Sequence, residues 1–169
     1  MKTRFEDVEK FVKSRMANWR ELSLRHFPES DDFITVVVKG HLLLEQYLTA
    51  LIGHYCVFPE RLVEARLSFL QKLRLTKALL FLPVSDHIWE ALELLNKIRN
   101  DVAHNLDKSS KLAAHLSRMR GLTPIFGNVD EATLKDLKDD TQAVKFLVSH
   151  CELRERRRFW LTYSFLQKS

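Results

Sequence analysis

The sequence predicts an all-α, single-domain helical bundle of about five to seven helices. The chain of 169 residues contains only 4 Gly and 4 Pro, which leaves few positions for the tight turns of an all-β fold. Apolar residues recur at intervals of three and four along most of the chain, which is the period of one buried helical face. Hydrophobic residues make up 46% and charged residues 29%, a balance typical of globular proteins, and we expect one domain over 1–169.

The N-terminal half predicts two long helices. Residues 4–27 carry a helical apolar stripe, and a second helix is expected over 32–56 with Ser30 or Asp31 as its cap. The start of this second helix, at 33–38, is rich in β-branched residues and alternatively suits a strand. No second strand candidate exists to pair with it, and the residues that follow have a helical period. We therefore expect a helix, apolar almost all round and central in the bundle.

Capping residues and prolines bound the remaining helices. Ser68 is expected to cap the helix that Pro83 stops, and Ser85 or Asp86 to cap the next, which ends near a break at 107–110. The remaining helices are expected at 60–65, 68–82, 86–106, 111–120 and 130–151, with a loop at 121–128 and a basic C-terminal helix at 152–169.

Positive charge is concentrated at the C-terminus. The formal net charge is +5, and residues 153–169 contribute +4 of it because five basic side chains face one Glu155. Such a patch suits a polyanion, and we expect it to bind RNA. The alternative is a solvated helix end without a partner. The predicted RNA-binding residues are Arg154, Arg156, Arg157 and Arg158.

Several classes of protein are not supported by the sequence. The N-terminus lacks the apolar segment of a signal peptide, and no apolar run is long enough to cross a membrane, so we expect a cytoplasmic protein. Nucleotide-binding and hydrolase motifs such as GxGxxG, GxxxxGK[ST], HExxH and GxSxG are missing. His41 and Glu45 lie one turn apart and are a candidate metal pair, but no third ligand is evident. We expect no metal and no cofactor.

A polar cluster at the end of an amphipathic helix is the most informative feature. Arg99, Asn100, Asp101 and His104 lie beside the apolar stripe of this helix. At about 100° per residue, Asn100 and His104 share a face, whereas Arg99 and His104 are about 140° apart. These two side chains can converge on one ligand if the helix ends near Ala103 or if the long Arg side chain bends round.

The residue types in this cluster suit phosphodiester cleavage. A histidine titrates near neutral pH and can move a proton to or from a hydroxyl group. An arginine binds phosphate with its planar fork and stabilises charge that develops on the phosphate oxygens. An asparagine can orient either partner. RNA supplies its own nucleophile, the 2′-OH, so this chemistry requires no metal.

The pattern Arg99-Asn100-xxx-His104 near a helix end resembles the HEPN superfamily of ribonucleases and RNA-associated helical domains. The resemblance covers roughly residues 30–106 and implies a homodimer in which two motifs meet at the dimer cleft. It also implies metal-independent RNA cleavage, often in toxin–antitoxin or phage-defence systems, with Arg99, Asn100 and His104 as catalytic residues. Glu45 and Asp101 are candidate supporting residues. Leu106 stands where a nucleotidyl-regulated toxin branch has Tyr, which argues against that control here.

A non-catalytic function remains open as the alternative. Residues 67–73, together with the helix at 88–106, are similar to proteins of the mannitol operon repressor type, which are helical regulators without an established catalytic site. In this interpretation Arg99 pairs with Glu45 or Glu93 inside the bundle, and His104 is a helix-end residue favoured by the helix dipole. The sequence therefore predicts either an endoribonuclease, with RNA and an antitoxin as partners, or a helical regulator or protein-interaction module.

Overall fold

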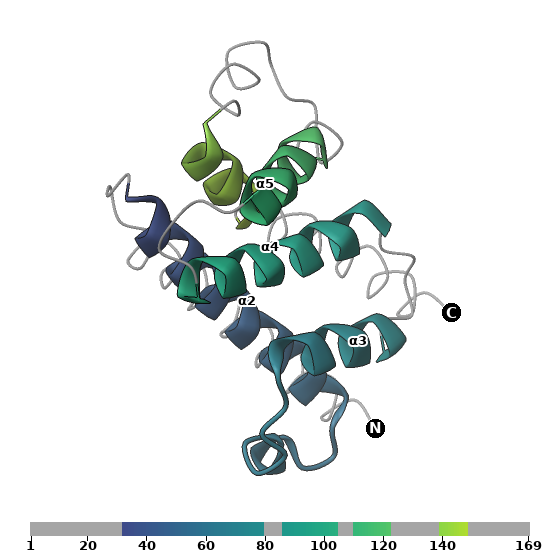
Figure 1. Ribbon diagram of the computed structural model, residues 1–169. Coiled ribbons are helices and arrows are strands. Elements are labelled where there is room, and N and C mark those ends of the chain that lie inside the picture. Colours follow the sequence, from purple (N-terminus) through teal and green to yellow (C-terminus); the bar gives the residue numbers. More distant parts are fainter. Residues whose placement is uncertain (1–31, 80–85, 105–109, 123–138, 149–169) are drawn as a thin grey trace.

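The computed structural model describes residues 32–79, 86–104, 110–122 and 139–148, and these confirm the all-α prediction. They contain helices and no strand (Figure 1). None of the helices in these ranges is long and apolar enough to cross a bilayer. The labelled elements are α2 (Phe33–Tyr55), the 3₁₀ helix η1 (Pro59–Leu62), α3 (Phe69–Leu79), α4 (Asp86–His104) and α5 (Ser110–Leu122), and residues 140–148 form a further helix.

Helix α2 forms despite its β-branched start because that start is buried. Val36 and Val37 are both fully shielded from solvent, so tertiary packing outweighs their modest helix propensity. The cap is Asp32, one residue after the expected Asp31. Its carboxylate accepts a hydrogen bond of 2.8 Å from the backbone N–H of Thr35. Hydrogen bonding to the side chain and then to the backbone of Thr35 lowers the pKa of Asp32.

Ser68 caps α3 as predicted, and it does so within a reciprocal capping box. The backbone N–H of Ser68 donates to Gln71 Oε1 at 2.8 Å, and the backbone N–H of Gln71 donates to Ser68 Oγ at 3.4 Å. The short helix expected at 60–65 is instead one 3₁₀ turn that begins at Pro59. None of the residues of η1 is buried, so no packed face extends this turn into a longer helix.

Two expectations near the C-terminal end of the described part are wrong: the end of the helix at 111–120 and the helical state of residue 139. Helix α5 continues past Gly121 to Leu122, because Leu122 lies on the same buried face as Met119 and is almost fully shielded. Of the range 130–151, where one helix is expected, residues 139–148 are described, and Asp139 lies in a bend and not in the helix. Its carboxylate accepts hydrogen bonds from the backbone N–H groups of Thr141 and Gln142, at 2.9 and 3.0 Å, so a helix begins at residue 140.

Helix α4 lies in the middle of the described bundle. In Figure 1 it lies between α5 on one side and α3 on the other, and α2 packs against both α3 and α4. One contiguous hydrophobic core joins α2, α3, α4, α5 and the helix at 140–148. The buried residues of α4 are Ile88, Trp89, Ala91, Leu92, Leu94, Leu95 and Ile98.

One apolar line on α2 stays exposed. Ile34, Val38 and Leu42 follow one another at intervals of four residues, and Leu42 is 51% exposed. Residues spaced by four lie on one face of a helix, so these three side chains form a continuous apolar strip. Helix α2 therefore packs against α3 and α4 with one of its faces. No described helix covers the face that carries Ile34, Val38 and Leu42.

Candidate active site at the end of α4

The three predicted catalytic residues lie on the last two turns of α4. Helix α4 ends at His104, so His104 itself is still helical and the end lies one residue after the expected Ala103. Arg99 Nη1 donates a hydrogen bond of 3.2 Å to Asn100 Oδ1, so these two side chains are brought together. Asn100 and His104 are exposed and Arg99 is half-buried. No ion pair joins Arg99 to Glu45 or Glu93 in the described part of the chain, which leaves the guanidinium plane available for an anion.

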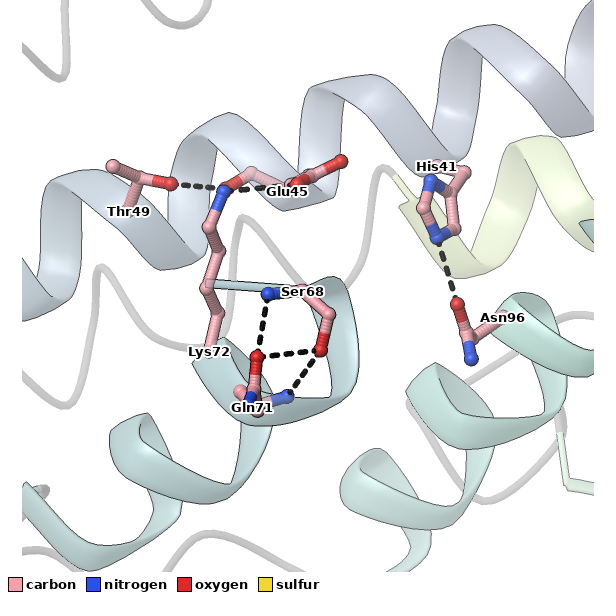
Figure 2. A network of polar contacts seen from close by, with 7 residues as sticks. All are labelled: His41, Glu45, Thr49, Ser68, Gln71, Lys72 and Asn96. Carbon is pink, nitrogen blue, oxygen red and sulfur yellow. Dashed lines mark hydrogen bonds and ion pairs between the residues drawn. The ribbon is translucent and has the colours of Figure 1, made fainter. Parts of the chain in front are cut away.

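The sequence alone gave no reason to place His41 beside this segment. His41 is 6% exposed, and its ring stacks on Phe69 of α3 with 4.2 Å between the ring centroids. Its Nε2 lies 3.0 Å from Asn96 Oδ1 of α4, and the imidazole donates, because an amide oxygen only accepts (Figure 2). The imidazole of His41 on α2 therefore contacts both α3 and α4. Its partner on α4, Asn96, lies one turn before Arg99.

Burial lowers the pKa of His41. Desolvation of the ring is the main cause that lowers its pKa, and the nearby cations Arg99 and Lys72 lower it further. The hydrogen bond that His41 donates to Asn96 and the Glu45 carboxylate act in the opposite direction without reversing the shift. Glu45 lies one turn after His41 on α2, and Arg99 lies one turn after Asn96 on α4, so both charges are near this ring.

Glu45 has a different partner from the one expected. Its carboxylate forms an ion pair of 2.9 Å with Lys72 of α3, partly shielded from solvent, as Figure 2 shows. A supporting role for Glu45 toward Arg99 stays a prediction, since its direct contact is with Lys72. His41 Nε2 and the Glu45 carboxylate each bind another side chain. Among the described residues, no group of three potential metal ligands lies together.

Asp101 is paired across the α4–α5 interface with a residue that the motif does not contain. His115 Nδ1 of α5 lies 2.9 Å from Asp101 Oδ2, and the two side chains are 28% and 20% exposed. A second pair on the same interface joins Arg118 to Glu90 through two hydrogen bonds of 2.6 and 3.0 Å. Its bidentate geometry lowers the pKa of Glu90 and raises that of Arg118.

The polar residues of α4 form one arc around the helix. With Arg99 taken as 0°, Asn100 follows at about 100°, His104 at about 140° and Asp101 at about 200°. The Arg99 edge of this arc faces His41 of α2, and the Asp101 edge faces His115 of α5. Asn100 and His104 are exposed between these edges, so a ligand in contact with His104 is nearer to the Asp101 edge than to the Arg99 edge.

Other predicted residues lie outside the described ranges. These are the tail arginines Arg154, Arg156, Arg157 and Arg158, and Leu106 after the end of α4. Comparisons with protein-family models, with curated proteins and with solved structures find no match for the chain. The functional argument therefore depends on the motif and on the arrangement of side chains around the end of α4.

Proposed function

We propose that this protein is a metal-independent endoribonuclease of the HEPN type that cleaves RNA by attack of the 2′-OH on the adjacent phosphate. Arg99 binds the phosphate and the charge that develops on it, Asn100 orients Arg99, and His104 transfers a proton. The observation that carries the proposal is the end of α4. There, a guanidinium held by Asn100 and an exposed imidazole occupy one polar arc with no carboxylate paired to the guanidinium in the described structure.

The remaining parts of the proposal concern its setting. The protein acts in the cytoplasm as a homodimer, in a toxin–antitoxin or phage-defence system, with an antitoxin as a protein partner. RNA approaches the site with the help of the basic C-terminal residues, which carry most of the net charge. These statements follow from the resemblance of the motif and from charge.

The experiment compares RNA cleavage by the wild type with that of three variants, His104→Ala, Arg99→Ala and Asn100→Ala, in buffer with EDTA. We expect His104→Ala to lower the rate by about 10²–10⁴-fold and Arg99→Ala by about 10²–10³-fold. Products ending in a 2′,3′-cyclic phosphate would identify the 2′-OH as the nucleophile. RNA with a single 2′-deoxy position at the cleavage site should resist cleavage there.

The matched control is His87→Ala, which removes another exposed histidine near the opposite end of α4. We expect this variant to cleave at the wild-type rate. An inactive wild type contradicts the nuclease proposal, and an active His104→Ala contradicts the assignment of the site.

A non-catalytic interaction module is the second candidate, and one observation favours it. The exposed apolar strip of Ile34, Val38 and Leu42 is the kind of surface that binds another protein. This candidate predicts that no RNA is cleaved under any condition. It also predicts that Leu42→Glu abolishes binding to the partner protein. The circular dichroism spectrum of this variant should show an unchanged fold.

A further inference from the structure

Cleavage by a 2′-OH requires two proton transfers at opposite sides of the phosphate. A base removes the proton of the 2′-OH as the 2′-O–P bond forms, and an acid protonates the 5′-oxygen as the P–O5′ bond breaks. One imidazole does not hold a proton for the leaving oxygen and accept one from the nucleophile at the same moment. The motif of each protomer contains one exposed imidazole, His104, so the second proton-transfer group must come either from the other protomer's motif or from another residue of the same chain.

A second imidazole lies on the same side of α4. Asp101 is three residues before His104, so the two share a face with about 5–6 Å between their Cβ atoms. The carboxylate of Asp101 accepts the Nδ1 proton of His115, at 2.9 Å, and Nε2 is the remaining site on the ring where a proton can be gained or lost. The His115 side chain is 28% exposed, so its ring is accessible from solvent.

We propose that His115, held in position by Asp101, is the second proton-transfer residue of this site. The proposal rests on the ribonuclease activity proposed above. His115 Nε2 takes the proton of the 2′-OH, the 2′-oxygen bonds to phosphorus, the P–O5′ bond breaks, and His104 in its protonated form gives its proton to O5′. The step leaves a 2′,3′-cyclic phosphate, a 5′-OH, a protonated His115 and a neutral His104, so protons and electron pairs balance.

Asp101 acts through His115 and is therefore a positioning residue. A carboxylate on Nδ1 sets the tautomer and the orientation of an imidazole whose Nε2 faces a substrate. This arrangement also explains why an acidic side chain next to a phosphate-binding Arg99 does not repel the substrate. Asp101 points toward α5, where its carboxylate accepts the hydrogen bond of His115, while Arg99 lies about 160° away around the helix.

The test separates the two proton transfers with two substrates. One is an ordinary dinucleotide, and the other is a uridine 3′-phosphate ester of 4-nitrophenol, whose leaving group departs without being protonated. On the dinucleotide we expect His115→Gln and His104→Ala each to lower the rate by about 10²–10⁴-fold. On the nitrophenyl ester His104→Ala should recover most of its activity, whereas His115→Gln should stay impaired because the 2′-OH must still lose its proton.

The pH dependence of kcat/KM gives a second readout that a purely structural role would not change. The wild type should show a bell-shaped profile, and His115→Gln should lose its acidic limb, which reports the base. Asp101→Asn should lower the rate less than His115→Gln. The matched control is Arg118→Gln, which breaks the neighbouring α4–α5 pair with Glu90 and carries no imidazole. It should cleave both substrates like the wild type.

Each outcome decides between the two proposals. If His115→Gln cleaves both substrates as fast as Arg118→Gln, His115 has no part in proton transfer, and the ribonuclease proposal with His104 stands. If the wild type cleaves neither substrate, both proposals fail. Thermal melts followed by circular dichroism identify a variant that does not fold. In that case His115→Asn, a smaller side chain with the same amide group, takes the place of His115→Gln in the same comparison.

Discussion

At the scale of single residues, burial changes the acid–base or hydrogen-bonding behaviour of some side chains in the described bundle. His41 is the clearest of these. Its ring is stacked on Phe69 and bound to Asn96, and the groups that face it are Glu45 from α2, Lys72 from α3 and Arg99 from α4. Burial of the ring, with a smaller effect of the two cations, makes protonation of His41 less favourable in the folded protein than in the unfolded chain.

This arrangement predicts that the fold loses stability in mild acid. In the unfolded chain a histidine has a pKa of about 6.5, and in the folded protein the pKa of His41 is lower. Between these two values the unfolded state binds more protons than the folded state, so the free energy of unfolding falls as the pH falls below about 6.5. It stops falling through this group once the pH is below the folded pKa.

The measurement is urea unfolding of the wild type and of His41→Gln, which keeps an N–H donor for Asn96 but does not titrate. We expect the free energy of unfolding to depend less on pH in the variant over this window, whatever its stability at neutral pH. His87→Gln controls for an exposed histidine on α4. Equal pH dependence of the wild type and His41→Gln would contradict the prediction.

Thr76 predicts a substitution that stabilises the protein. Its side chain is 2% exposed, and within the described ranges its Oγ1 has no hydrogen-bond partner. Replacing it with valine keeps the shape and removes a buried polar group, so the free energy of unfolding should rise by about 1 kcal/mol. Thermal and urea unfolding measure this. The contrasting variant Thr76→Ser keeps the hydroxyl and loses a methyl group, and it should be less stable than the wild type.

At the scale of helices, the features predicted from sequence are those that depend on near neighbours. Ser68 was predicted as a cap because it stands just before an apolar stripe, and its partner Gln71 is only three residues away. The positions of α2 and α4 follow in the same way from their apolar periods. The end of α5 was missed because Gly121 is usually a helix terminator, whereas burial of Leu122 extends the helix.

The capping box of α3 predicts a measurable loss of stability. Ser68→Ala removes the oxygen that accepts the N–H of Gln71 and leaves that donor without its partner, so the free energy of unfolding should fall by about 1 kcal/mol. Ser68→Asp keeps an acceptor at the same position and should be close to the wild type. If both variants lose the same stability in urea unfolding, the hydroxyl does not act as a cap.

The candidate site was predicted only in part, because half of it comes from contacts that are distant in the sequence. Arg99, Asn100 and His104 are close along the chain, and their common helix end was expected. His41 and Asn96 are 55 positions apart, and Asp101 and His115 are 14 apart on different helices. No local pattern specifies such pairs, since they depend on how α2 and α5 pack against α4. The one signal in the sequence for these contacts is a histidine inside an amphipathic helical segment, as at His41 and His115.

At the scale of the whole molecule, charge and site are separated along the sequence. Residues 153–169 have a net charge of +4, and the other residues together have +1. A basic segment of this kind raises the affinity for RNA of any sequence, whereas in the proposed function the cleavage takes place at the polar arc of α4. The two functions should therefore be separable by mutation.

The last prediction tests that separation through the salt dependence of RNA binding. Replacing Arg156, Arg157 and Arg158 with glutamine should lower the affinity for a single-stranded RNA of any sequence. It should also reduce the slope of log K against log salt by about 2, since each released counterion contributes about 0.7. The cleavage rate at saturating RNA should stay near that of the wild type. The binding assay uses His104→Ala as the background, so that the RNA stays intact.

Three arginines near η1 and α3 provide a control of equal charge. Arg61, Arg66 and Arg74 are exposed, and replacing them with glutamine removes the same +3 from a different part of the chain. If binding depends on the tail, this control should keep the wild-type slope. An equal reduction of the slope in both triple variants would contradict the prediction. It would mean that RNA binding depends on the net charge of the molecule and not on its C-terminal segment, because long-range attraction does not depend on where the charge is placed.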